Sequence, residues 1–160
     1  MPARFRTLAP GLALALTLVL ALAVCRTTVA VADTASDVKN LYDRFLAAQN
    51  ARDLDAVRAV LLATPEFQWV SDGKSFWGAD ELVARMSQFQ KAEVWQVTPD
   101  YSRSRVVEVA ADAAYLYQPL TLRIGPAAKP SEIPFLVNVL SVRTAEGWRI
   151  AALFTTTEKP

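Results

Sequence analysis

The segment of residues 41–78 constrains the fold more than any other part of the chain. Apolar residues recur every three or four positions from 38 to 48, which predicts an amphipathic helix. Residues 50–52 interrupt this pattern, and Asp53 is suited to cap a second helix with apolar positions between 54 and 61. The segment therefore begins with two short helices joined by a tight break.

An aromatic strand is expected directly after these helices. Apolar and polar residues alternate over 67–71, and Asp72-Gly73 is a typical hairpin turn. Gly78 ends the returning run 75–77, and the acidic residues behind it suit the start of a helix over 80–89. We therefore expect a β-hairpin between two helices.

Strand patterns fill the second half of the chain, at 94–97, 101–110, 115–124, 133–143 and 148–156. The last two of these segments carry apolar residues on both faces. A sheet packed on one side only shows a polar outer face, so we expect the outer face to be covered as well. This pattern favours a homodimer formed through the outer sheet face.

Three sequence runs together resemble a known family. The run AAQNARDLDAVRAVLL, the aromatic strand with its Asp-Gly turn, and the run FWGADEL are similar to the SnoaL-like branch of the nuclear transport factor 2-like superfamily. The resemblance covers residues 35–157. It implies an α+β cystatin-like cone, in which about three helices pack in the concave face of a curved, mixed, mostly antiparallel sheet and leave a pocket.

Residues 1–32 have the pattern of a signal peptide. Arg4 and Arg6 precede an apolar run at 11–24, and small residues at 30–32 suit cleavage after Ala32. The domain then occupies residues 33–160. The pattern predicts a periplasmic or secreted protein with no membrane attachment after cleavage.

Two alternatives remain open for this N-terminal segment. No charge falls between Arg6 and Arg26, so a retained membrane anchor is one of them. Lipidation of Cys25 is the other, although Val24 stands where lipoprotein signals usually place a small residue. If cleavage follows Ala32, the domain has no cysteine and no disulfide.

Composition argues against several classes of function. Three of the 17 basic residues and none of the 16 acids lie in residues 1–32, so the net charge of the domain is 14 − 16 = −2. Without a basic stripe, nucleic acid is not expected as a partner. Histidine is absent from the chain. The sequence therefore offers neither a typical metal site nor a histidine base, and no cofactor is expected.

Ketosteroid isomerases are the best-studied relatives implied by the resemblance. In those enzymes a carboxylate moves a proton, while a tyrosine and a second acid stabilise the oxyanion. Here the tyrosine position falls on Phe45, the base position falls near Trp69 or Val70, and the second acid position falls near Asn138 or Val139. These departures argue against isomerase chemistry and favour a non-catalytic domain.

Asp72 is the acid nearest to the base position and the one catalytic candidate, although an ordinary Asp-Gly turn explains it as well. Aromatic walls with a few polar groups suit a small apolar ligand, with core packing as the alternative. The residues expected to line such a pocket are Tyr42, Trp69, Trp77, Trp95, Tyr117 and Asn138.

Three functions are compatible with the sequence. The first is binding of a small hydrophobic or amphipathic molecule in the cone without catalysis. The second is an acid/base enzyme, such as a cyclase, isomerase or hydratase of a polyketide- or steroid-like substrate, which needs a carboxylate facing the pocket. The third is a dimeric interaction module whose pocket is filled by side chains.

Overall fold

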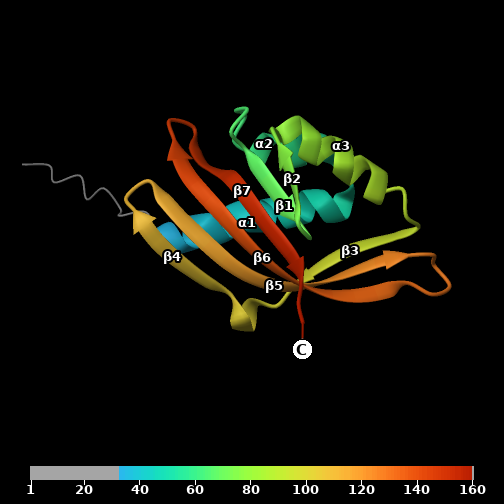
Figure 1. Cartoon of the computed structure of the whole chain (residues 1–160). Coiled ribbons are helices and arrows are strands. Elements are labelled where there is room, and N and C mark those ends of the chain that lie inside the picture. The colour runs from blue at the N-terminus through green and yellow to red at the C-terminus, as the bar shows by residue number, and fades with distance from the viewer. Residues whose placement is uncertain (1–32, 160) are drawn as a thin grey trace, which may run out of the picture. The chain divides into compact units, whose positions relative to one another are not determined.

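Three helices pack on one face of a seven-stranded sheet in the computed structural model, which describes residues 33–159 (Figure 1). The elements in chain order are α1 (Thr34–Ala51), α2 (Leu54–Val60), β1 (Gln68–Ser71), β2 (Lys74–Trp77), α3 (Ala79–Phe89), β3 (Val94–Pro99), the 3-10 turn η1 (Tyr101–Arg103), β4 (Arg105–Ala110), β5 (Ala113–Gly125), β6 (Ser131–Thr144) and β7 (Gly147–Thr157). The signal peptide expected from the sequence and Cys25 lie outside the described residues.

The sheet confirms the expected α+β cone. Its strand order is β2-β1-β7-β6-β5-β3, and β4 pairs with β5 along the half of that strand that β3 leaves free. β1 and β7 run parallel, whereas all other pairs are antiparallel. The sheet is therefore mixed and mostly antiparallel. Within residues 33–159, no helix has both the length and the apolar character needed to span a membrane.

The helix ends follow local sequence signals. The side chain of Asp33 accepts a hydrogen bond from the amide of Ala35, so α1 begins before the periodic pattern at 38. α1 ends at Ala51, and Arg52, which caps it, adopts a left-handed backbone conformation with φ 60°. Asp53 then caps α2 by accepting from the amide of Ala56 at 2.9 Å. The predicted break between the two helices is thus confirmed.

Two turns show how the strands are connected. Asp72 and Gly73 have φ values of 44° and 82°, as the predicted two-residue hairpin requires. The strand expected at 101–110 is wrong in its first part, where the chain forms η1. The reason is Asp100, whose carboxylate accepts bonds from Ser102 and Arg103 and bends the backbone into a turn.

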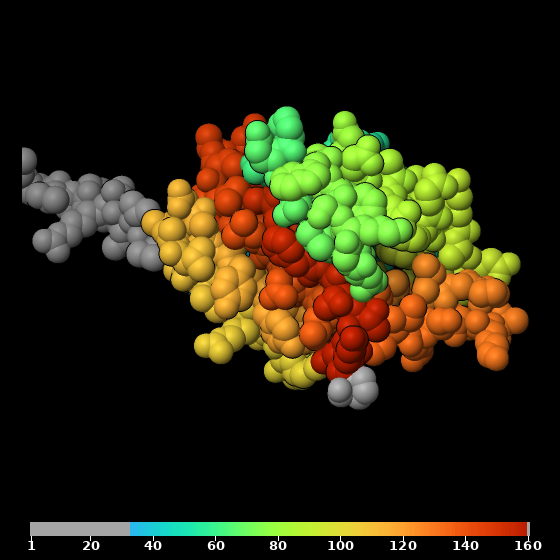
Figure 2. Space-filling model, in the orientation of Figure 1, coloured from blue at the N-terminus to red at the C-terminus, as the bar shows by residue number. Residues whose placement is uncertain are grey.

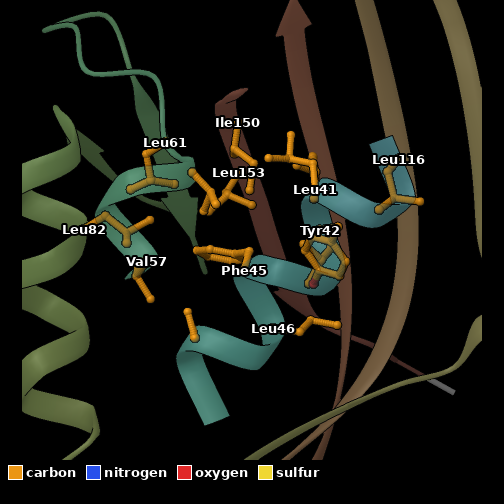
Figure 3. Packing of buried hydrophobic residues seen from close by; sticks show 14 of the residues in the cluster. Leu41, Tyr42, Phe45, Leu46, Val57, Leu61, Leu82, Leu116, Ile150 and Leu153 are labelled. Atoms are coloured by element: carbon orange, nitrogen blue, oxygen red, sulfur yellow. The ribbon is translucent and has the colours of Figure 1, made fainter. Parts of the chain in front are cut away.

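The core lies between the helices and the inner face of the sheet. Figure 3 shows side chains from all three helices meeting those of β5 and β7. Leu41 and Phe45 of α1 are buried against this face, as are Val57 of α2 and Leu82 of α3. Ile150 of β7 is fully buried among them. The helical periodicity seen in the sequence therefore marks the faces that pack.

Candidate ligand-binding cavity

A cavity of about 290 Å³ remains between the helices and the inner face of the sheet. Side chains of α1 and α3 line one side, and those of β1, β3, β5, β6 and β7 line the other. Most of the lining side chains are aliphatic or aromatic. A space of this size and character suits a small ligand with about ten heavy atoms.

α1 supplies the inner end of the cavity. Tyr42, Phe45 and Gln49 lie one helical turn apart on its buried face, and all three line the cavity. Burial raises the pKa of the Tyr42 hydroxyl, with a smaller contribution from nearby Asp43 and Tyr101. The Tyr42 hydroxyl is therefore protonated at neutral pH and is available as a hydrogen-bond donor.

The wall on the β1 side is built around Trp69. Its indole nitrogen donates to the hydroxyl of Thr155 at 3.1 Å, and that hydroxyl donates to the carbonyl of Val70 at 3.2 Å. The Trp69 ring also packs against Phe76 with centroids 5.0 Å apart. These contacts fix the orientation of one of the two indole rings that line the cavity.

Phe89 and Trp95 form the rim on the side of α3 and β3. Their rings are parallel, with centroids 6.3 Å apart, and both are half-buried. The loop between them is held by Arg52, whose guanidinium donates to the carbonyls of Gln90, Ala92 and Glu93. Arg52 thus positions the rim without lining the cavity.

Asp72 is the one charged residue among those that line the cavity. It lies in the turn between β1 and β2 and is exposed at the mouth. Its Oδ1 atom accepts a hydrogen bond from the amide of Thr157 at 3.3 Å, which ties the carboxylate to the end of β7. The mouth of the cavity therefore carries one anchored negative charge.

Four of the residues selected from the sequence meet at this cavity. Tyr42, Trp69, Trp95 and Asp72 all line it. They come from α1, β1, β3 and the β1–β2 turn, so the fold brings together side chains that are far apart in the sequence. In addition, Trp148 is buried in the core and does not line the cavity.

Three other residues expected in the pocket are not part of it. Trp77 is displaced because the hairpin register pairs Trp69 with Phe76, which leaves Trp77 on the outer face. Tyr117 and Asn138 are paired neighbours on β5 and β6. Both point outward because strand side chains alternate, and the residues next to them are the ones that face the helices.

Most of the aliphatic lining lies outside the set of residues expected from the sequence. Leu120, Leu122 and Ile124 share one face of β5, and all three line the cavity. Phe135 and Val137 of β6 continue this surface. The alternation of β5 contains the signal, because its other face is more polar, whereas both faces of β6 are apolar and its alternation alone does not identify the inner one.

The described residues offer no metal centre. Between residues 33 and 159, no three side chains of His, Cys, Asp or Glu gather closely enough to hold an ion. The polar residues among those that line the cavity include Tyr42, Gln49, Ser71, Asp72 and Thr155. This arrangement is able to bind and orient a ligand by hydrogen bonds.

Solved structures with the same fold are numerous. An uncharacterised protein with a cystatin-like fold from Caulobacter vibrioides is 16% identical, with a TM-score of 0.67 over 78% of this chain and 89% of that one. A ketosteroid isomerase-like protein from Erwinia carotovora is 19% identical, with a TM-score of 0.65 over 81% and 99%. A hexachlorocyclohexane dehydrochlorinase from Novosphingobium barchaimii is 12% identical, with a TM-score of 0.67 over 78% and 86%.

These likenesses show the shared fold, since every one of the three identities is low. A comparison with curated proteins finds no match. The family model of the SnoaL-like domain, however, matches residues 38–153, which include most of α1 and most of β7. The chain therefore belongs to the SnoaL-like family.

Proposed function

We propose that this domain binds a small hydrophobic or amphipathic molecule in the cavity and does not transform it. The observation that carries the proposal is the cavity itself, which is open, mostly apolar, and provided with a few hydrogen-bonding groups. Its aromatic wall is already held in place by the bond between Trp69 and Thr155. A preorganised wall lowers the entropy lost on binding.

The unfilled cavity also bears on the alternative of a filled interaction module. Side chains that closed the cone would leave no space between Phe45 of α1 and Val137 of β6, yet both face the cavity. The absence of a second carboxylate among the lining residues supports binding over acid/base catalysis. Tyr42 stays protonated, so it contributes a neutral donor.

The proposal is tested with a variant in which a larger side chain fills the cavity. We expect 1-adamantanemethanol, a compact neutral alcohol, to bind to the purified protein and to change its tryptophan emission, because Trp69 and Trp95 line the cavity. Val137→Phe should weaken this binding at least about tenfold by occupying the cavity, whereas Leu136→Phe on the opposite strand face should not. Equal binding by both variants would contradict a ligand site in the cone.

A second candidate function is supported by one feature of the cavity. Asp72 and Tyr42 line the same cavity, and an acid/base enzyme requires a carboxylate of this kind beside its ligand. The solved structures with this fold include a dehydrochlorinase and an isomerase-like protein. An enzyme of this type should exchange the α-protons of 2-decalone with deuterium from solvent, and Asp72→Asn should abolish the exchange. The binding proposal expects no exchange above the rate in buffer.

We also propose that the protein is a homodimer formed through the outer face of the sheet. Trp77, Tyr115 and Phe154 are 57%, 38% and 41% exposed on this face. Figure 2 shows the strands of this sheet on the surface, with β7 in red beside the green β1–β2 hairpin. An apolar sheet face of this kind favours a protein contact.

Export to the periplasm or beyond remains part of the proposal, on the strength of the sequence of residues 1–32. N-terminal sequencing of the protein recovered from its native compartment provides the test. A mature chain that begins at Asp33 supports cleavage after Ala32. A chain that begins at Met1 supports a retained anchor.

A further inference from the structure

We propose that the ligand of this cavity carries a positively charged amine on an apolar body. The inference rests on the proposed binding function and specifies the chemical class of the ligand. In this arrangement the apolar body occupies the space between α1 and the sheet, and the amine lies at the mouth beside Asp72. A carboxylate on the same body is disfavoured at this position.

The charge of the lining residues favours a cation. Asp72 is the one acidic residue among those that line the cavity, and neither lysine nor arginine occurs among them. Within the part of the chain that the structure describes, Asp72 makes no salt bridge. Its carboxylate therefore remains available to a cation, while the bond from the Thr157 amide keeps it at the mouth.

The aromatic rings that line the cavity also favour a cation. Phe89 and Trp95 form its rim, and Trp69 and Phe135 line the cavity. Aromatic rings attract cations through the negative potential of their faces. Arg85 already uses this property from outside, because its guanidinium carbon lies 4.8 Å from the Phe89 centroid and 5.4 Å from that of Phe76.

Two basic residues near the mouth limit how strongly the cavity favours an amine. Arg85 packs on Phe89, and Lys74 pairs with Ser71 across the hairpin. Both are exposed, and neither lines the cavity. Water and salt therefore screen their repulsion of a bound amine, whereas Asp72 contacts the ligand space directly.

A matched series of ligands provides the test. The compounds are 1-adamantanemethylamine, 1-adamantanemethanol and 1-adamantanecarboxylic acid, which share one apolar cage and differ in charge. We expect calorimetric titration at low salt and neutral pH to give the tightest binding for the amine. The expected step is about fivefold from amine to alcohol, with the acid weaker again, which is the size of an exposed ion pair.

Asp72→Asn is the matched variant for this experiment. Asparagine tolerates the positive φ of this position and keeps an oxygen that accepts from the Thr157 amide, so the substitution removes only the charge. The substitution should lower the affinity for the amine to that for the alcohol, and it should leave the affinity for the alcohol unchanged. Glu108→Gln, an exposed acid on β4 that does not line the cavity, should alter none of the three affinities.

The outcomes separate this inference from the proposed function. If the alcohol binds and the amine is no tighter, or if Asp72→Asn leaves the preference intact, the amine inference is overturned and the binding function stands. If none of the three compounds binds, both are overturned. A preference for the amine that disappears in Asp72→Asn and shrinks in 1 M salt supports the inference.

Discussion

Arg52 connects the stability of the domain to the shape of its binding site. It combines two features, a left-handed backbone conformation at the end of α1 and three hydrogen bonds to the loop between Phe89 and Trp95. Substitution by alanine removes the hydrogen bonds and keeps the unfavourable backbone. Substitution by glycine removes the same hydrogen bonds but suits the backbone. The two variants therefore separate the two features.

The magnitudes follow from the contacts. The guanidinium of Arg52 lies 2.5, 2.8 and 3.0 Å from the three carbonyl oxygens, and two of these bonds are exposed. Because water replaces the lost donors, we expect Arg52→Ala to lower the free energy of unfolding by about 2 kcal/mol. A left-handed residue other than glycine costs about 1 kcal/mol, so Arg52→Gly should lose only about 1 kcal/mol.

Thermal unfolding and ligand titration measure the two effects separately. For a domain of this size, Arg52→Ala should lower Tm by about 7 °C and Arg52→Gly by about half as much. Both variants should weaken the binding of 1-adamantanemethanol to the same extent, since both release the loop that holds Phe89 and Trp95. Equal Tm values for the two variants would refute the cost of the left-handed backbone at Arg52. An unchanged affinity for the alcohol would refute the role of Arg52 in positioning Phe89 and Trp95.

Three further outcomes are expected. Leu41→Ala removes a fully packed side chain and should lower the free energy of unfolding by about 3 kcal/mol in urea titrations. Bonds from Ser102 and Arg103 lower the pKa of Asp100 from 3.8 to about 2, so its contribution to stability is present above pH 4 and is lost as the pH falls through about 2. Asp100→Asn should therefore flatten the decline of Tm between pH 4 and 2. Phe154→Lys should convert a dimer to monomers in sedimentation experiments while leaving ligand binding unchanged, and a dimer that persists would argue against the outer-face interface.

Local chemistry explains why the sequence predicted the element boundaries well. The cap at Asp53 and the turn at Asp72-Gly73 each depend on a few neighbouring residues, and both occur as expected. The short turn at Tyr101 was missed, although the capping side chain of Asp100 precedes it directly in the sequence. There the β-propensity of the following residues concealed a local signal.

Errors in the site arose where the face of a strand decides the outcome. A two-residue turn fixes the hairpin register, so the pairing of Trp69 with Phe76, and hence the outward position of Trp77, follows from the sequence in principle. The alternation of β5 places Tyr117 on the same face as Thr121 and Arg123, so its outward position also follows from the sequence. No such rule exists for Asn138, because both faces of β6 carry apolar side chains and the inner face is chosen by packing against helices that are far away in the sequence. Tertiary packing is therefore the missing information.

The place of the cavity follows from the unequal lengths of helix and strand. An 18-residue helix such as α1 spans about 27 Å, whereas a 14-residue strand such as β6 spans about 46 Å. α1 therefore leaves part of the inner face uncovered. Along β6, Val139 and Ser141 are buried, while Ile133 and Phe135 at the other end stay half-buried beside the cavity. Because the tightly packed end supplies the core, the open end is free to change its lining, and with it the ligand, at little cost in stability.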